Sequence, residues 1–387
     1  MTNKKARVIA FYLPQYHPIE ENDKWWGKGF TEWTNVGGSK PLFRGHDQPR
    51  IPADLGYYDL RLPEVREEQA RMAKEAGVEG FCYYHYWFGK GKRLLERPFN
   101  EVLESGSPDY PFCLCWANHT WSNNTWDKKK SLFTDSLLME QTYAEEDYEA
   151  HFYDVLKAFK DERYITVDGK PLFMIYTPYA FKDIKNFMNV WRKLAVSNDL
   201  KGIHFVIHST SLMLRKQGAI HDDCPSVPIT DAKYIFDKLL DLGFDAINSI
   251  GMTRAEYIVN GKYKYLFRHF CSKMLDLNMV TTYKQKKIND RLFTVEDKKE
   301  NVYPTILPNW DRSPRAGKRT PIYTNSTPRV FEELLRDTIK MIENKQDEHK
   351  IIFLKSWNEW GEGNYVEPDL TTGTAYLDVL RKVLLQE

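Results

Sequence analysis

Short apolar runs alternate with longer amphipathic runs from one end of the chain to the other. A buried parallel strand is short and nearly continuous in apolar residues, whereas a helix is longer and apolar on one face, so this alternation predicts repeated βα units. Eight such units are the repeat of a (β/α)8 barrel, the TIM-barrel fold of the α/β class. The eight expected strands are Val8–Tyr12, Gly80–Tyr84, Phe112–Trp116, Leu172–Tyr176, His204–His208, Asp245–Ser249, Val302–Leu307 and Ile351–Ser356.

The amphipathic runs carry helix signals at their ends, because several begin with Pro, Asp or Thr and stop just before Gly. The stretch from Leu13 to Leu62 forms instead a loop of roughly fifty residues, too long to be only a connection and therefore predicted to be functional. The expected helices are Pro63–Ala76, Arg93–Ser105, Glu145–Phe159, Phe181–Ser197, Asp231–Leu242, Tyr263–Asp276, Pro328–Glu343 and Thr374–Leu385.

The length of the chain does not require more than one domain. Its 387 residues would allow two average domains, but α/β barrels use roughly 200 to 400 residues as one unit. Low-complexity segments, repeats and linkers rich in Pro, Gly or Ser are missing from the sequence. We therefore expect residues 1–387 to form a single (β/α)8 catalytic domain with long βα loops.

The balance of charge excludes some partners. Lys and Arg number 55 against 54 Asp and Glu, so the chain lacks the basic field that attracts nucleic acid. No run approaches the length of about 18 apolar residues that a membrane span needs. The segment Met1–Arg7 leads directly into the first strand without an apolar signal region. The sequence predicts a cytoplasmic protein without stable membrane insertion and without a nucleic-acid partner.

Five cysteines, an odd number, lie mostly inside apolar runs, which is typical of reduced and buried thiols. Cys113 and Cys115 are separated by one residue, which is too close for the usual zinc spacing. We expect neither a metal ion nor another cofactor.

Aromatic residues make up 14% of the chain, and many stand beside Gly, Asn, Pro or His instead of within apolar runs. Flat aromatic faces pack against the C–H faces of sugar rings, while neighbouring polar groups bond the hydroxyls. This composition indicates a glycan or glycoconjugate as substrate.

Polar and aromatic clusters follow seven of the eight predicted strands, where barrel enzymes place their active residues. Any one of these His or Trp residues is equally well explained as packed scaffold, and it is their coincidence across strands that favours a site. The candidate substrate-binding residues are Tyr16, His17, Trp26, Glu32, Trp33, His85, Trp87, Trp116, Asn118, His119, Trp121, Trp310, Asp311, Asn358 and Trp360.

Two carboxylates three residues apart, Glu359 and Glu362, follow the last strand. If the chain turns there in a helical sense, both side chains project to one side. Two neighbouring carboxylates push their pKa values apart, so that one stays protonated and the other ionised near neutral pH. Glycoside hydrolysis needs that division between an acid and a base or nucleophile. Trp357 and Trp360 alongside weaken the alternative of a solvated acidic turn.

Long motifs of the chain resemble those of WbsX-type proteins of polysaccharide and lipopolysaccharide biosynthesis loci, which are related to the family 99 glycoside hydrolases. The resemblance covers nearly the whole chain. It is carried by the segments Ala10–His17, Trp26–Trp33, Pro52–Gly56, Gly80–Trp87, Phe112–Asn118, Asn358–Gly363 and Glu367–Asp369.

For the hydrolases, the resemblance implies a (β/α)8 barrel, no metal, and endo-acting, retaining cleavage of α-mannosidic linkages. It also implies a Glu-Trp-x-Glu-Gly segment. The first Glu is the base that acts on the sugar 2-hydroxyl to give an anhydro-sugar intermediate, and the second is the acid/base at the glycosidic oxygen. By position, these roles fall on Glu359 and Glu362.

Two departures limit that transfer. WbsX-type sequences usually read Ala-Asn-Glu-Asn-Trp where this chain reads Ala117-Asn-His-Thr-Trp121, so His119 replaces a carboxylate. The hydrolases carry His between the paired acids, where this chain has Gly361. Similarity to a mannosidase therefore does not fix mannose as the substrate.

Three functions stay open from the sequence. A retaining glycoside hydrolase acting on α-linked glycans is the main interpretation. A glycosyltransferase of O-antigen or capsule assembly is the second, although the chain contains no Asp-x-Asp pair and no Gly-rich turn that clearly opens a helix. A glycan-binding barrel without catalysis is the third, and the intact Glu359 and Glu362 argue against it.

Overall fold

A closed barrel of eight parallel strands forms the centre of the protein, in a computed structural model that describes residues 5–122, 137–210, 231–261 and 280–386. Each strand pairs with its neighbour in chain order, and β1 pairs with both β2 and β14, which closes the barrel. The predicted (β/α)8 fold is thus confirmed. Its strands are β1 (Arg7–Tyr12), β2 (Gly80–Trp87), β4 (Phe112–Trp116), β8 (Lys170–Ile175), β9 (His204–Thr210), β10 (Ala246–Ile250), β12 (Val302–Ile306) and β14 (Ile351–Leu354).

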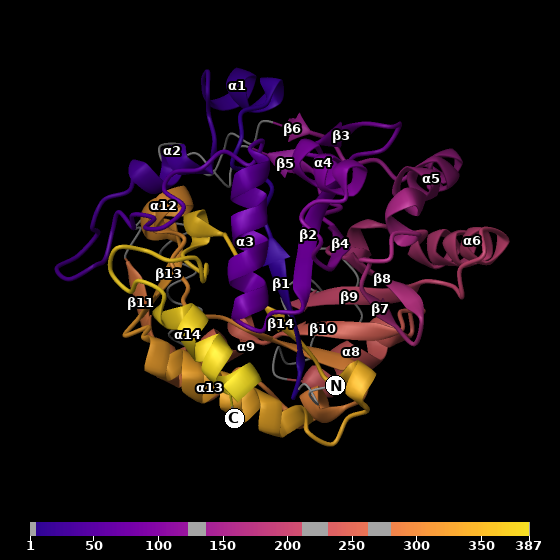
Figure 1. Cartoon of the computed structure of the whole chain (residues 1–387). Helices are drawn as coiled ribbons and strands as arrows, with labels where there is room; N and C mark the ends of the chain where they lie inside the picture. The colour runs from indigo at the N-terminus through magenta and orange to yellow at the C-terminus, as the bar shows by residue number, and fades with distance from the viewer. Residues whose placement is uncertain (1–4, 123–136, 211–230, 262–279, 387) are drawn as a thin grey trace.

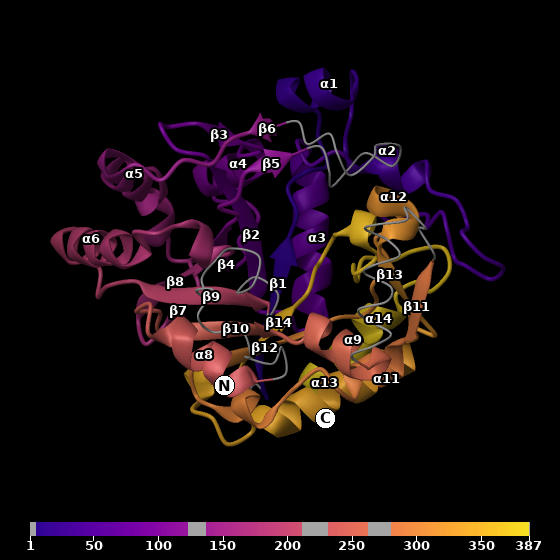
Figure 2. The ribbon, with the colours of Figure 1, turned by 180° about the vertical axis from the view of Figure 1, so that it is seen from behind.

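Helices surround the strands, as Figures 1 and 2 show from two sides. The longer ones are α3 (Pro63–Glu75), α4 (Arg97–Ser105), α5 (Tyr148–Phe159), α6 (Ile184–Ser197), α8 (Ala232–Leu240), α9 (Met252–Asn260) and α13 (Pro328–Ile342). The shorter ones are α1 (Glu20–Trp26), α2 (Glu32–Gly37), α11 (Gln285–Asn289), α12 (Ser313–Ala316) and α14 (Ala375–Arg381).

Short strands decorate the loops between these elements. They are β3 (Arg93–Leu94), β5 (Trp121–Ser122), β6 (Leu137–Met139), β7 (Thr166–Val167), β11 (Thr281–Lys284) and β13 (Pro321–Thr324). Single helical turns complete the connections, at η2 (Glu145–Asp147), η3 (Pro178–Ala180), η4 (Val295–Lys298), η5 (Gly317–Arg319), η6 (Asp347–His349) and η7 (Trp360–Glu362), and η8 (Lys382–Gln386) continues α14.

Two predicted helices differ from the structure or lie outside it. The helix expected from Arg93 begins only at Arg97, because Arg93 and Leu94 pair antiparallel with the end of β2 and Leu95 has a positive φ of 59°. A side chain at such a φ rarely continues a helix. The helix expected at 263–276 lies outside the described residues.

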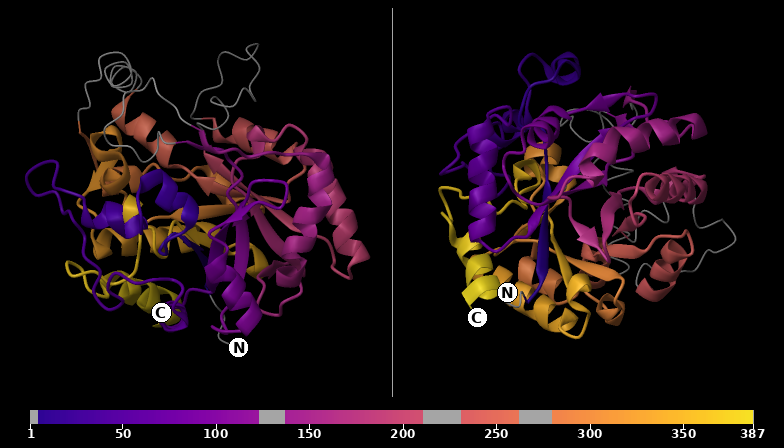
Figure 3. Two further views of the ribbon diagram at one scale, coloured as in Figure 1. Left: turned by 90° about the horizontal axis from the view of Figure 1, so that it is seen from above. Right: turned by 45° about the vertical axis from the view of Figure 1, so that its right-hand side comes forward.

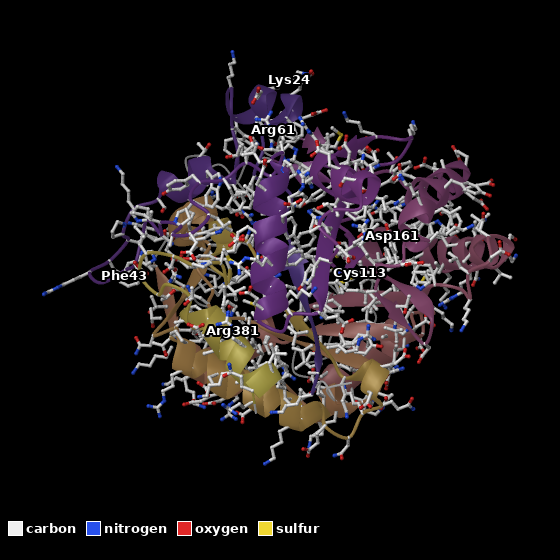
Figure 4. The ribbon with its side chains drawn as sticks, viewed as in Figure 1. Lys24, Phe43, Arg61, Cys113, Asp161 and Arg381 are labelled. Atoms are coloured by element: carbon white, nitrogen blue, oxygen red, sulfur yellow. The ribbon has the colours of Figure 1, made fainter. Side chains whose placement is uncertain are left out.

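Aromatic side chains fill both faces of the barrel wall. Inside the barrel, Phe11 stacks on Tyr84 and Phe353. Outside it, Trp191 of α6 is fully buried against Phe173 of β8. Cys82, Cys113 and Cys115 are buried and free, as predicted for them, whereas the other two cysteines lie outside the described residues. Figure 4 shows Cys113 among the strands and Lys24 at the edge of the molecule, on α1.

The loops that follow the strands gather at one end of the barrel. In Figure 1, α1 and α2, which follow β1, lie in the upper part of the view together with α12, which follows β12. Both marked chain ends lie at the bottom, and the two views of Figure 3 show the same strands within their ring of helices. Within the described ranges, no helix combines the length and apolarity needed to cross a bilayer.

The start of β2 allows a stability test. A Cβ atom added at Gly80 would overlap the carbonyl oxygen of Pro111, which is backbone and cannot rotate away. We expect Gly80→Ala to lower the free energy of unfolding by about 1–3 kcal/mol through overpacking, measured by urea denaturation. The control is Gly37→Ala at the end of α2, where an added Cβ meets nothing within 4 Å. Equal stability of the two variants would contradict the tight β2–β4 contact.

Candidate active site

The turn after β14 brings Glu359 and Glu362 together. The 3₁₀ turn η7 is closed by a hydrogen bond from the Glu362 amide to the Glu359 carbonyl, at 3.1 Å. The helical sense that the sequence analysis required for this pair is therefore present. Both carboxylates are buried, at 5% and 8% exposure, yet both line a cavity of about 190 Å³.

Hydrogen bonds from the loop after β1 hold this turn in place. The side-chain amide of Asn358 accepts from the Leu13 amide at 2.8 Å and donates to the Leu13 carbonyl at 3.0 Å. The Tyr16 hydroxyl donates to the Asn358 carbonyl at 2.6 Å. On its other side, the Trp360 indole donates to Glu367 at 2.6 Å. These hydrogen bonds fix the position of the turn that carries the acid pair.

One guanidinium joins the two acids to a third carboxylate. Nη1 of Arg315, on α12, lies 2.8 Å from Glu359 Oε1 and 2.9 Å from Glu362 Oε1. Nη2 of the same side chain lies 2.8 Å from Glu32 Oε1, at the start of α2, where Glu32 is fully buried. A Cβ added at Gly361 would overlap both Glu32 Oε2 and Arg315 Nε. The cluster therefore packs directly against the backbone of the η7 turn, and a side chain at position 361 would require Glu32 and Arg315 to shift.

Burial and charge move the two pKa values apart. Burial and the neighbouring Glu362 raise the pKa of Glu359 above its ordinary value. Burial also acts to raise the pKa of Glu362, but Arg312, Arg315 and Lys355 outweigh it and lower the pKa overall. Nε of Arg312 lies 2.8 Å from Glu362 Oε1, which accounts for the asymmetry. A proton bound by the pair is therefore favoured on Glu359 over Glu362.

Aromatic and polar side chains form the rest of the cavity wall. Within the described residues, Oε2 of Glu359 has no hydrogen-bond partner, so it is available to a ligand. The aromatic part of the wall consists of Trp25, Trp26, Tyr84, Tyr86, Trp121 and Tyr176. Its main polar groups are Gln15, Asn22, His119, Arg312 and Lys355. Such a wall suits a sugar, which presents both C–H faces and hydroxyls.

The predicted site residues divide into two groups. Beside the acid pair, Trp26, His119 and Trp121 line the cavity. Glu32 lies behind it, bound to Arg315. The remaining candidates are outside the cavity lining: Tyr16, His17, Trp33, His85, Trp87, Trp116, Asn118, Trp310, Asp311, Asn358 and Trp360.

Most of the second group has scaffold contacts instead. His85 bonds His151 at 2.9 Å, and the Trp87 indole donates to Asp147 at 2.9 Å. Asp311 accepts from His46 and Gln48, and Asn118 donates to the Thr177 carbonyl at 2.8 Å. The indoles of Trp33 and Trp116 donate to backbone carbonyls. His17 is buried, with no partner for either ring nitrogen among the described residues.

Strand alternation explains why some of the predicted residues point away from the cavity. Along β2, His85 and Trp87 point outward to the helix layer, whereas Tyr84 and Tyr86 point to the cavity. Successive residues of a strand face opposite sides, so the tyrosines were predictable once the inward register was known. Arg312, Arg315 and Lys355 were also missed. Lys355 directly follows β14, and its position at a strand end was the available signal.

The fold and the paired acids define a (β/α)8-barrel protein with two neighbouring carboxylates in the loop after its last strand. The family described as "Glycosyltransferase WbsX" matches residues 8–380. The chain therefore belongs to the WbsX family. An "Uncharacterized protein WxcX" from Xanthomonas campestris pv. campestris is 35% identical over 381 residues, which are 98% of this chain and 50% of the relative. The chain thus spans about half the length of the curated relatives it matches.

Solved structures share the barrel at low sequence identity. A "Glycoside hydrolase-like protein" superimposes with a TM-score of 0.56 at 14% identity, covering 99% of this chain and 95% of the other. The family 99 endo-α-mannosidase from Bacteroides thetaiotaomicron superimposes with a TM-score of 0.55, also at 14% identity, covering 98% and 96%. These similarities establish a common fold.

Removing the shared guanidinium tests the cluster. Arg315→Met leaves three buried carboxylates without their common counter-charge, and we expect a loss of about 3–5 kcal/mol in the free energy of unfolding near neutral pH. The loss of the cation raises the carboxylate pKa values in the folded state. Stability is therefore retained at acidic pH and lost as the pH rises through the folded-state values. Urea denaturation at several pH values measures both effects.

The control for Arg315→Met replaces a solvent-exposed arginine that also contacts two carboxylates. Arg71 contacts Glu68 and Glu75 on the exposed face of α3, and Arg71→Met should change stability little at any pH. A loss in Arg315→Met that is as small as in Arg71→Met, or independent of pH, would contradict the buried cluster.

Proposed function

We propose that this protein is a retaining glycoside hydrolase that cleaves α-linked glycans with Glu359 and Glu362. The observation that carries the proposal is the contact of both carboxylates with one nitrogen of Arg315 at the wall of an aromatic cavity. Retaining glycosidases hold their two carboxyl groups roughly 5–5.5 Å apart. Two carboxylate oxygens within 3 Å of one nitrogen are necessarily close to each other, which supports a separation of that order. The proposed domain is the whole chain, because the eight barrel strands run from β1 near its start to β14 near its end.

The pair divides the chemistry. One carboxyl group gives its proton to the glycosidic oxygen as that oxygen leaves the anomeric carbon. The other, ionised, removes the proton of the sugar 2-hydroxyl, whose oxygen forms the new bond to the anomeric carbon. Water then attacks the anomeric carbon and gives a proton to the first group, while the broken bond returns the 2-oxygen to a hydroxyl with the proton held by the second group. In the empty site the opposite pKa shifts favour the proton on Glu359. The resemblance to the hydrolases implies the reverse assignment, with the base at Glu359 and the acid at Glu362.

A glycosyltransferase is the second candidate, and the description of the matching family favours it. A transferase would use the same cavity and acids, with an activated sugar as donor and a glycan hydroxyl in place of water as acceptor. The two candidates differ in what must be added before a product forms.

A glycan panel tests the proposal. Wild-type protein is incubated with α-linked bacterial and yeast glycans without any nucleotide sugar, and released sugars are followed by mass spectrometry. We expect release by wild type, and a loss of about 10²–10⁴-fold or more in Glu359→Gln and Glu362→Gln, because each variant removes one half of the acid–base pair. The control is Asp297→Asn, which alters a buried carboxylate outside the cavity lining.

The outcomes separate the candidates. Transfer only after nucleotide-linked or lipid-linked sugars are added would replace hydrolysis by the transferase. Binding of glycans without either reaction would leave a non-catalytic barrel. The glycosyl fluoride of the released sugar identifies the acid, because fluoride leaves without protonation. Its cleavage should survive in Glu359→Gln; survival in Glu362→Gln instead would assign the acid as the resemblance implies.

Arg312 gives a pH test of the same pair. Its charge does most among the cations to lower the pKa of Glu362, so Arg312→Gln raises that pKa. The ascending limb of kcat/KM against pH reports the lower pKa of the coupled pair in the free enzyme. We expect this limb to move to higher pH in Arg312→Gln and to stay in place in Arg312→Lys, which keeps the charge. An unmoved limb in both variants would limit Arg312 to glycan binding.

A further inference from the structure

Lys355 places an ammonium group at the cavity wall without a carboxylate partner. The residue directly follows β14, is 5% exposed, and lines the same cavity as the acid pair. Its Nζ lies 5.8 Å from the ring centre of Phe11 and 5.9 Å from that of Trp310. Throughout the described ranges, no side chain or carbonyl lies within hydrogen-bond or ion-pair distance of Nζ. Two distant ring contacts compensate an ammonium only in part.

The other two cations of the cavity wall are paired. Arg315 contacts three carboxylates, and Arg312 contacts Glu362. A buried ammonium costs free energy unless it is paired or hydrogen-bonded. The nearby Tyr176, Glu359 and Glu362 outweigh burial and raise the pKa of Lys355, so it stays charged. Lys355 is thus a preformed positive charge that faces the space where a ligand binds.

The charge balance of the cluster also favours a negatively charged ligand. Arg312, Arg315 and Lys355 carry three positive charges, and Glu32 is committed to Arg315 behind the wall. When Glu359 and Glu362 share one proton, the cluster carries one positive charge in excess. A ligand with a single negative charge neutralises it.

Neutral donors accompany this charge. Tyr176 lies near Lys355 and its ring centre is 5.7 Å from that of His119, and both line the cavity. Burial lowers the pKa of His119 to about 4, so the ring is neutral. Its Nδ1 is buried and has no hydrogen-bond partner in the part of the chain that the structure describes. An imidazole and a phenol beside an ammonium can hydrogen-bond the oxygens of one anionic group.

We propose that the sugar bound against Lys355 is acidic, a uronic acid whose carboxylate pairs with Nζ. The inference rests on the proposed function, because it names the substrate class of the same cavity. A single ammonium matches the single charge of a carboxylate. Phosphate groups are more often held by arginine forks or by rows of backbone amides. The competing explanation, in which Lys355 only adjusts the pKa values of the acid pair, requires no charge on the ligand.

Binding measured by saturation-transfer NMR tests the inference without any need for cleavage. The probes are the methyl α-glycosides of glucuronic, galacturonic and mannuronic acid, each with its neutral parent glycoside, and mannose 6-phosphate as a phosphate probe. We expect at least one uronide to bind wild type about ten- to hundredfold more tightly than its neutral parent. Lys355→Met should abolish this preference, and Lys355→Arg should retain it.

Two controls secure the reading of these variants. Lys185→Met removes an exposed lysine of α6 and should bind like wild type. Neutral parent glycosides should bind Lys355→Met as they bind wild type, which would show that the cavity is intact. A collapsed cavity would instead lower the Tm of Lys355→Met. In that case the test of the uronide preference rests on Lys355→Arg, which keeps the charge.

Several results would overturn the inference. These are equal binding of uronides and parents by wild type, no detectable binding of any uronide, or a preference that persists in Lys355→Met. Binding of mannose 6-phosphate alone, lost in Lys355→Met, would replace the carboxylate by a phosphate. A uronide preference without cleavage of any glycan would support the acidic subsite while removing the proposed hydrolase, so the two failures remain distinguishable.

Discussion

The contact of one guanidinium with three carboxylates is the interaction on which the candidate site depends. Arg315 comes from the loop after β12, Glu32 from the loop after β1, and Glu359 and Glu362 from the turn after β14. These three strands are neighbours in the barrel, in the order β1, β14, β12. The ion cluster therefore links three adjacent loops at the position of the acid pair. Without this shared cation, the three buried carboxylates would bind protons more readily, because burial and their mutual repulsion would be less compensated.

The same cluster constrains the backbone beside it. Gly361 separates the paired acids, and any side chain there would displace Glu32 and Arg315. The sequence departure at this position, glycine where the family 99 hydrolases carry histidine, is thus linked to the buried ion pair behind it. A histidine would occupy the space that this chain gives to Glu32 and Arg315. The barrel is shared at this position while the residue is not, so the fold alone does not fix the substrate.

The barrel was legible in the sequence because parallel strands buried on both faces read as apolar runs, and all eight were found within a few residues of their observed ends. The acid pair was legible because two carboxylates and two indoles follow one strand. The side chains around the acid pair were harder to predict from the sequence. Selecting Tyr84 and Tyr86 over His85 and Trp87 required the register of β2, and register depends on pairing with distant strands. Arg315 lies far from its three partners in the chain, so its role follows only from the folded arrangement.

The positions of Lys355 and the acid pair connect binding to proton transfer. Lys355 is one of three cations that lower the pKa of Glu362, and its charge acts on Glu359 in the same direction. An anionic sugar paired with Lys355 would cancel part of that effect, so the pKa values of both acids would rise when the ligand binds. Protonation of the pair would then be favoured at the moment a glycosidic oxygen arrives to receive the proton. A neutral sugar at the same place would leave the pair more fully ionised. In this arrangement a negative charge on the substrate would favour the proton that the acid pair has to donate, and the cation proposed to recognise the substrate is one of the three that lower the pKa of Glu362 in the empty site.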